Sequence, residues 1–219
     1  AWERERAEGR WGGEARKRLT LRPVPSKPIA TPGTPDAPDA FAGGRYQVSK
    51  FLGEGGKKRV YQAHGTLLDR DIAFALIKTD GLDDASRSRI TREAQAMGRL
   101  GTHPNIVTVF DLGTEDNAPF MVTELMGGGD VEGLLEDAED NRLSLEQTIE
   151  MGKAICEGLQ FAHAQGVIHR DIKPGNILLQ DDEPVVADFG IALAVGAAGS
   201  NRLTETGLSL GTPLYMSPE

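Results

Sequence analysis

Four polar side chains with catalytic potential lie close together in the second half of this chain. Residues 167–179 read V-I-H-R-D-I-K-P-G-N-I-L-L, and residues 185–190 read V-V-A-D-F-G. The first stretch supplies a potential base at Asp171 and a cation at Lys173. Asn176 and Asp188 carry amide and carboxylate oxygens, which hard divalent cations prefer as ligands. This combination of base, cation and metal ligands, bracketed by apolar residues, indicates a catalytic site.

A glycine-rich turn upstream is a second candidate for ligand binding. It reads G-E-G-G-K-K-R-V over residues 53–60. Glycines let backbone N–H groups approach phosphate oxygens closely, although the same pattern also occurs in ordinary hairpin turns. The candidate phosphate-binding residues of this turn are Gly53, Glu54, Gly55, Gly56 and Val60.

Short apolar segments separated by glycines must position this turn. They predict strands at residues 47–53, 59–64, 71–79, 107–112 and 120–125. Residues 84–100 have apolar side chains at helical spacing after an acidic start, which predicts a helix between the third and fourth strands. The first half of the predicted domain is therefore a five-stranded sheet with one helix.

A second helix is predicted to begin after Leu143 and to lie before the catalytic stretch. Ser144 and Gln147 have the spacing of a capping box, and Gly166 is the predicted stop. Its predicted inner face comprises Ile149, Gly152, Cys156, Leu159 and His163. We expect Cys156 to serve as core packing.

The composition is that of a globular protein with an acidic surface. Of the 219 residues, 39% are hydrophobic and 26% are charged. The net charge of −9 argues against binding to nucleic acid or to anionic membranes. Cys156 is the only cysteine, so an intrachain disulfide is excluded and a reducing compartment, the cytoplasm, fits best. No apolar run approaches the roughly 20 residues of a membrane span.

Residues 1–42 differ in composition from the rest of the chain. Glutamate and arginine alternate up to Arg18, and closely spaced prolines follow from Pro23 to Pro38. Proline fixes φ and removes a backbone donor, so we predict a disordered tail over residues 1–42. The composition turns helical after the glycines at 127–129, which places a second boundary between residues 43–126 and 127–219.

These motifs resemble the bacterial Hanks-type Ser/Thr protein kinases, C-terminally truncated. The resemblance runs from about residue 45 to residue 219 and includes the final G-T-P-L-Y-M-S-P-E. It implies an α+β fold with a small five-stranded antiparallel lobe at 43–126 and a partial, mainly helical lower lobe at 127–219. It also implies transfer of the γ-phosphoryl group of ATP, with Mg²⁺, to Ser or Thr hydroxyls of a protein substrate.

The resemblance assigns catalytic roles within the first motif. Asp171 accepts the proton of the substrate hydroxyl, and Lys173 neutralises charge on the transferred group. Asn176 and Asp188 hold Mg²⁺, with Asp188 connecting the metal to the β- and γ-phosphates.

In the same family a strand lysine holds the α- and β-phosphates. The resemblance gives this role to Lys78, with Glu93 of the predicted helix as its ion-pair partner. Two positions depart from the family pattern. Lys58 stands where the third glycine of the turn belongs, and Leu76 stands where alanine is expected.

Other residues are assigned to the nucleotide by position. Glu124 and Met126 form the hinge that bonds the adenine edge, next to Thr123 at the gatekeeper position. Asp130 meets the ribose or, as an equally good interpretation, caps a helix. Leu178 is the remaining predicted nucleotide contact. The family also predicts that Met97, Val109, Phe189 and His169 stack on one another, and ordinary contacts of two core and two loop residues are the alternative, which predicts the same burial.

The segment after Asp188 is predicted to carry regulation. Thr204 and Thr206 resemble the paired threonines that such kinases autophosphorylate, which implies self-association, and a simple polar loop is the alternative. Arg170 would pair with a phosphate there. Thr212 is predicted to hydrogen-bond the catalytic Asp171 on the substrate side.

Two alternatives concern catalysis itself. A pseudokinase would bind nucleotide without transferring phosphate, but every charged catalytic position of the motif is present. The chain starts at Ala1 and ends at Glu219 inside a motif, so we expect a fragment. Such a fragment could bind nucleotide and be catalytically inert.

Overall fold

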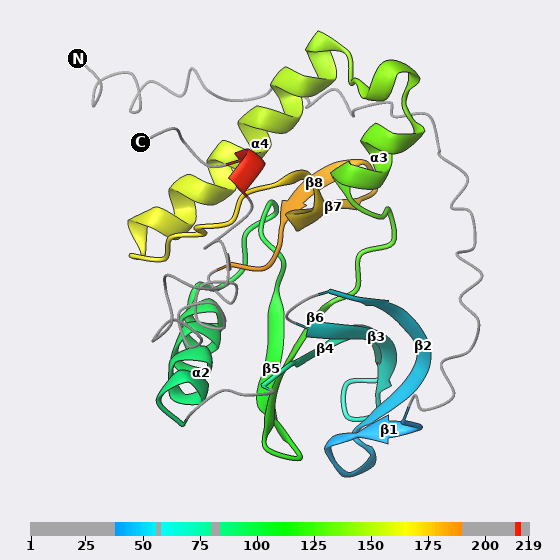
Figure 1. Ribbon diagram of the computed structural model, residues 1–219, viewed down its shortest axis with the longest axis vertical. Helices are drawn as coiled ribbons and strands as arrows, with labels where there is room; N and C mark the ends of the chain where they lie inside the picture. Colours follow the sequence, from blue (N-terminus) through cyan, green and yellow to red (C-terminus); the bar gives the residue numbers. More distant parts are fainter. Residues whose placement is uncertain (1–37, 56–57, 80–83, 190–212, 216–219) are drawn as a thin grey trace.

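The described residues form two lobes, one built on a sheet and one mainly helical (Figure 1). The computed structural model describes residues 38–55, 58–79, 84–189 and 213–215. The sheet and α2 lie together at one end, and α3, α4 and the β7–β8 hairpin lie at the other. The predicted two-lobed α+β fold is therefore confirmed.

The small lobe is a curled antiparallel sheet with strand order β1-β2-β3-β4-β6-β5. Its strands are β1 (Ala40–Phe41), β2 (Tyr46–Glu54), β3 (Lys58–Gly65), β4 (Arg70–Ile77), β5 (Val109–Glu115) and β6 (Ala118–Glu124). The helix α2 (Asp84–Arg99) lies against β5 and β6. The five predicted strands and the predicted helix all form.

The sixth strand, β1, was not predicted, and it corrects the boundary of the tail. Phe41 was assigned to the disordered tail, yet only 3% of its surface is exposed. Its ring stacks on that of Phe74, with centroids 4.2 Å apart. Burying a large aromatic ring is strongly favourable, so this single side chain orders the short segment that carries it. The small lobe therefore starts before residue 43.

The two faces of the sheet have different neighbours because side chains alternate along each strand. On β4, Ile72 and Phe74 point outward into an apolar cluster with Tyr61 of β3. Ile77 belongs to the other face and packs against Ile90 of α2. We call these the outer face and the inner face of the sheet.

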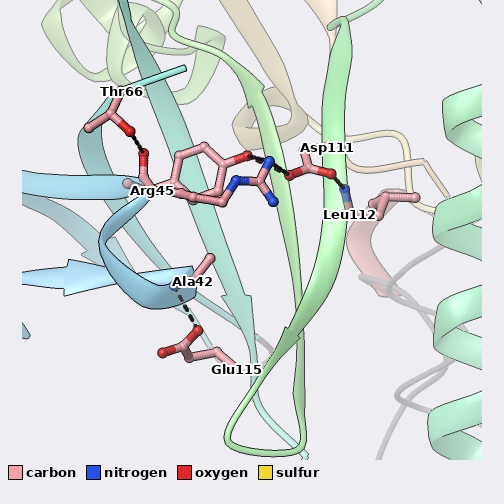
Figure 2. A network of polar contacts seen from close by, with 7 residues as sticks. Ala42, Arg45, Thr66, Asp111, Leu112 and Glu115 are labelled. Atoms are coloured by element: carbon pink, nitrogen blue, oxygen red, sulfur yellow. Dashed lines mark hydrogen bonds and ion pairs between the residues drawn. The ribbon is translucent and has the colours of Figure 1, made fainter. Parts of the chain in front are cut away.

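A polar network fastens the beginning of the domain to β5 (Figure 2). Asp111 accepts hydrogen bonds at Oδ2 from the Tyr46 hydroxyl at 2.5 Å and from Arg45 Nη2 at 2.7 Å. The backbone N–H of Ala42 donates to Glu115 Oε2 at 2.8 Å. Burial and the bond to Asp111 raise the pKa of Tyr46 to about 12. The tyrosine therefore stays protonated and acts as the donor.

The lower lobe consists of short helices around one hairpin. Its elements are α3 (Val131–Asp137), a 3₁₀ turn (Glu139–Asn141), α4 (Leu145–Ala164), a 3₁₀ turn (Pro174–Asn176), β7 (Ile177–Gln180), β8 (Glu183–Val186) and a 3₁₀ turn (Pro213–Tyr215). The predicted capping box is confirmed, since Ser144 Oγ accepts from Gln147 N and Gln147 Oε1 accepts from Ser144 N. Gly166 follows the helix with φ +75°, as its predicted stop requires.

The predicted inner face of α4 is wrong in phase. The buried residues of the helix are Met151, Gly158 and Ala162, whereas Ile149 is 46% exposed and Cys156 is also exposed. Gly158 explains the orientation, because a Cβ there would lie 2.8 Å from the carbonyl oxygen of Asn105. Close approach to the small lobe at this glycine sets which side of the helix is inside. Within the described residues, α4 and the other helices are too short or too polar to cross a bilayer.

The lobes are joined by backbone pairing and by a shared apolar cluster. Val107 N donates to Val186 O at 3.0 Å, and the buried Asn105 Nδ2 donates to Pro184 O at 3.0 Å. Met97 of α2 packs in the same cluster as Val186 and Phe189. These contacts hold the β7–β8 hairpin against the small lobe, and this positions the residues that follow β8.

Candidate functional site

The catalytic stretch is organised around a buried histidine. His169 is only 1% exposed, and its Nδ1 accepts the backbone N–H of Asp171 at 3.2 Å. Since Nδ1 is an acceptor, Nε2 carries the proton and donates to Ala187 O at 2.7 Å. Burial lowers the pKa of His169, so the neutral ring is favoured. One imidazole thus ties the backbone of Asp171 to the residue before Asp188.

Asn176 makes a second connection between the same two segments. Its Nδ2 donates to Asp171 O at 2.7 Å and to Asp171 Oδ2 at 3.3 Å. Its backbone oxygen accepts from Ala187 N at 2.9 Å. Asn176 is 6% exposed and ends a 3₁₀ turn that starts at Pro174. The structure therefore brings Asp171, Asn176 and the residue before Asp188 close together, as the sequence motif predicts for a shared site.

Two residues of this site have left-handed backbone conformations. Arg170 has φ +67° and Asp188 has φ +62°. Such values are uncommon for non-glycine residues and persist only where the surroundings hold them. The hydrogen bonds of His169 and Asn176 flank both positions and supply that restraint. The carboxylate of Asp188 is thereby turned toward the small lobe, where it meets Lys58.

Lys58 is the residue of this site that sequence reasoning did not place. Its Nζ forms hydrogen bonds to both carboxylate oxygens of Asp188. The side chains of Lys58 and Asp188 are 28% and 25% exposed, so the pair is partly exposed to water. The available sequence signal was the lysine in place of the third glycine of the turn. From the sequence, this residue appeared only as a departure from the pattern.

Lys78 lies in a different set of contacts. Its Nζ is 2.5 Å from Glu54 Oε1, and Glu54 also pairs with Arg59 at 3.3 Å. The hydrogen bond from Lys78 is the main cause that lowers the pKa of Glu54. The backbone of Glu93 lies in α2, but its side chain is outside what the structure describes. The predicted pairing of Lys78 with Glu93 therefore stays a prediction.

The glycine-rich turn is described on both sides of residues 56–57. Gly53 lies opposite Val60 in the β2–β3 pairing, and Gly55 N donates to Lys58 O at 2.9 Å. A Cβ at Gly53 or Gly55 would meet nothing within 4 Å. Gly56 lies outside the described residues. The described glycines thus leave open space above the turn, which suits close approach of a ligand.

The predicted nucleotide contacts gather where the lobes meet. Met126 and Leu178 pack in one apolar cluster with Val107, Val185 and Ala187. Thr123 of β6 is 8% exposed, and the Glu124 N–H donates to Thr108 O at 3.0 Å. An apolar cluster that ends at Ala187, the neighbour of Asp188, can pack against a flat ring whose phosphates reach the polar site.

Asp130 acts as a helix cap in this structure. Its Oδ1 accepts from Gly133 N at 2.8 Å at the start of α3. This confirms the capping interpretation, and the ribose contact stays a prediction. Thr204, Thr206 and Thr212 fall outside the described residues, so the predicted phosphorylation sites and substrate contact also stay predictions.

The predicted stack of four side chains between the lobes is present. Met97, Val109 and Phe189 belong to one apolar cluster. The rings of Phe189 and His169 lie with centroids 4.6 Å apart and an interplanar angle of 53°. The position of α2 is thus connected through packed side chains to the segment that carries Asp188.

The donor set fits a hard cation with oxygen ligands. Among the described residues, no group of three or more histidine, cysteine or acidic side chains could hold a metal by itself. Mg²⁺ is usually held by one or two carboxylates together with substrate phosphates, and it does not need such a group. Asn176 presents its amide oxygen because Nδ2 is engaged by Asp171. Asp188 supplies a carboxylate whose charge is balanced by a lysine.

Comparison with known proteins matches residues 46–219 to the protein kinase domain. The DNA damage-responsive serine/threonine-protein kinase RqkA of Deinococcus radiodurans is 39% identical over 190 residues, which is 84% of this chain and 27% of that protein. The serine/threonine-protein kinase PksC of Streptomyces coelicolor is 39% identical over 188 residues, covering 82% of this chain and 34% of its own length. The chain thus spans about a quarter to a third of these curated relatives.

Solved structures show the same fold. The kinase domain of PknI from Mycobacterium tuberculosis aligns with a TM-score of 0.64 and 28% identity, covering 70% of this chain and 60% of that chain. An apo form of PpkA aligns with a TM-score of 0.66 over 76% of this chain and 66% of that chain. Its 22% identity supports the fold alone.

Proposed function

Because the chain belongs to the protein kinase domain family, we propose that the protein containing it transfers the γ-phosphoryl group of ATP to Ser or Thr hydroxyls of protein substrates. The observation that carries this proposal is the joining of Asp171 to Asn176 by side-chain hydrogen bonds, with Asp188 held next to them. Base and metal ligands are thereby preorganised in one place. Preorganised positioning supplies much of the catalysis in phosphoryl transfer.

Asp171 is the proposed base for the substrate hydroxyl. Its backbone is held by His169 and its side chain by Asn176, so the carboxylate is oriented before a substrate arrives. A well-placed base contributes about 10²–10⁴ in rate. Lys173, two residues on and half-buried, is the proposed cation that neutralises charge on the transferred group.

Asn176 and Asp188 are the proposed ligands of Mg²⁺. The metal would supply positive charge that stabilises the phosphate oxygens during transfer. What the chain itself contributes is the fixed separation of two oxygen ligands, one on each side of the β7–β8 hairpin. The hydrogen bond from Ala187 N to Asn176 O holds that separation.

Two lysines are candidates for the cation that holds the α- and β-phosphates. Lys78 is the candidate from sequence resemblance. Lys58 is the candidate from its contact with Asp188. For the adenine ring we propose the apolar cluster at Met126 and Leu178, with Glu124–Met126 backbone groups at its edge.

We further propose that phosphorylation of Thr204 and Thr206 regulates the enzyme. Arg170 precedes the proposed base and is exposed. A phosphate with a charge of roughly −1.5 to −2 would pair well with it. Autophosphorylation between two copies and a cytoplasmic location, where ATP is supplied, belong to the same proposal.

The test is ³²P transfer from ATP by the intact protein, with autophosphorylation and a generic Ser/Thr protein substrate as readouts. Asp171→Asn should reduce the rate by about 10²–10⁴ without changing the unfolding temperature. Asp181→Asn is the matched control, since Asp181 is an exposed carboxylate ten residues away whose φ of +49° suits asparagine. Nucleotide binding without transfer by the wild type would favour a pseudokinase instead.

A further inference from the structure

The two candidate lysines lie on opposite faces of the small-lobe sheet. Lys58 pairs with Ile77 across β3 and β4, and directly opposed residues of antiparallel strands share a face. Ile77 packs against Ile90 of α2, so this is the inner face, which is turned toward the lower lobe. The contact of Lys58 with Asp188 agrees with this placement.

Lys78 is out of phase with that inner face. Side chains alternate along a strand, so Ala73, Ala75 and Ile77 share one face and Lys78 follows with the other. Its partner Glu54 lies opposite Arg59, which alternates with Lys58 and shares the outer face with Tyr61. A charged cluster therefore lies on the outer face of the sheet and comprises Lys78, Glu54 and Arg59.

One alternate position before Ile77, the inner face of β4 carries a short side chain, Ala75. Ala75 pairs with Val60, one alternate position from Lys58, and is 5% exposed. Because Ala75 has only a methyl group, β4 places no long cationic side chain on the inner face at that position. The ammonium group that reaches Asp188 instead comes from the neighbouring strand, across 130 residues of sequence.

We propose that Lys58, from the glycine-rich turn, is the cation that holds the nucleotide phosphates in this kinase, and that Lys78 fastens the turn to β4 through Glu54. This inference rests on the proposed function, because it concerns the same site. Asp188 would hold Mg²⁺ together with phosphate oxygens of the nucleotide, and those oxygens would then lie close to its carboxylate. An ammonium group that already contacts Asp188 can exchange this partner for those oxygens with a small change in its side-chain torsions.

The first experiment measures nucleotide affinity of the intact protein by calorimetry. Lys58→Met should weaken binding of Mg²⁺ with a non-hydrolysable ATP analogue about tenfold or more, since a charge-assisted contact to phosphate is lost. Binding of adenosine, which lacks phosphates, should change less than about twofold. Lys50→Met, at an exposed lysine of β2, is the matched control and should leave both affinities within about threefold of the wild type. Lys78→Met should weaken binding of the analogue less than Lys58→Met does, since Lys78 contacts the turn through Glu54. Lys58→Arg keeps the charge and should restore part of the affinity for the analogue.

A second experiment needs no variant and removes the risk of misfolding. An acyl-phosphate derivative of ATP places a reactive carbonyl next to the γ-phosphate. The nearest lysine amine attacks this carbonyl, an amide forms, ATP leaves, and one proton is released to solvent. Of Lys58 and Lys78, peptide mapping should find the acyl group mainly on Lys58, beside any label on Lys173 near the γ-phosphate, and should find it suppressed by excess ATP.

The outcomes separate the two proposals. If the wild type transfers phosphate but Lys78→Met weakens analogue binding more than Lys58→Met, or the acyl group maps to Lys78, the assignment of Lys58 is overturned and the kinase function stands. If the wild type neither binds the analogue nor transfers phosphate, both proposals fail. A larger loss for Lys58→Met than for Lys78→Met, with label on Lys58, supports the assignment.

Discussion

The outer face of the small-lobe sheet and the catalytic loop at residues 167–176 differ in the kind of side chain that is buried in each. On the outer face, Phe74 is fully buried and stacks on Phe41, with further aromatic rings around them. In the loop, the buried side chains are polar ones, His169 and Asn176. The loop also contains Arg170 at a left-handed φ, whereas no residue within β2, β3 or β4 has one.

This difference indicates where stability and chemistry reside. Apolar burial holds the outer face together without directional requirements. The loop is held by hydrogen bonds, such as that from Asp171 N to His169, and these bonds also orient residues of the proposed catalytic site. Substitutions in the first region should therefore change the free energy of unfolding, and substitutions in the second should change the rate. The predictions below test that separation.

The largest effect is expected for Phe74→Ala on the outer face. Truncating a fully buried phenylalanine costs about 3–5 kcal/mol of folding free energy. Urea unfolding of the intact protein measures it, and phosphoryl transfer per folded molecule should stay within about threefold of wild type. Leu52→Ala is the control, since Leu52 is 39% exposed on the same sheet. A loss of rate without a loss of stability would contradict the separation of the two regions.

Asp188→Asn should have the opposite profile. Phosphoryl transfer should fall at least about a hundredfold, because a carboxylate ligand to the metal is lost. The free energy of unfolding without nucleotide should change by less than about 1 kcal/mol, since the pair with Lys58 is partly exposed and asparagine tolerates the left-handed φ. Activity and urea unfolding are measured on the same preparation. A variant that transfers phosphate normally would remove Asp188 from the site.

The polar network at Tyr46 should make the free energy of unfolding depend on pH in alkaline solution. The unfolded chain releases the tyrosine proton near pH 10, whereas the folded protein keeps it until about pH 12. The folded state binds more protons in this window, so the free energy of unfolding falls as pH rises from about 10 to 12. Tyr46→Phe should remove this part of the slope. Identical pH dependence in wild type and variant would show that the hydroxyl is not protected.

The smallest effect concerns His169 in weakly acidic solution. Its pKa in the folded protein is lowered by burial, so the unfolded state takes up the proton first as pH falls. The contribution of this residue to stability is complete above about pH 6.5 and decreases as pH falls below that value. NMR titration of the His169 ring should give a midpoint below 6.5. A midpoint at or above this value would contradict the buried neutral ring.

Much of the fold followed from local patterns in the sequence. Short apolar segments mark β2–β4, and apolar residues recur at helical spacing in α2. These patterns depend on residues close in sequence, so the elements form as predicted. The capping box at Ser144 and the stop at Gly166 also form, because they satisfy backbone groups within one turn.

Other predictions failed because they depended on distant partners. The inner side of α4 is set by the approach of Gly158 to Asn105, and this contact is not encoded in the periodicity of the helix. Phe41 is buried only because Phe74, 33 positions later (74 minus 41), offers it a stacking surface. The sequence around Phe41 does not show this partner, so the short segment is predicted to belong to the disordered tail.

The amino-acid sequence by itself determined the family, the elements and the order of Asp171, Asn176 and Asp188. These depend on residue types at fixed short spacings. Only the tertiary structure decided which lysine reaches Asp188. That choice depends on the face of the sheet from which each side chain leaves and on the closeness of two strands from different lobes. Lys58 and Asp188 meet because the fold brings the start of β3 within side-chain reach of the segment that follows β8. Lys78, one position out of phase, contacts Glu54 instead.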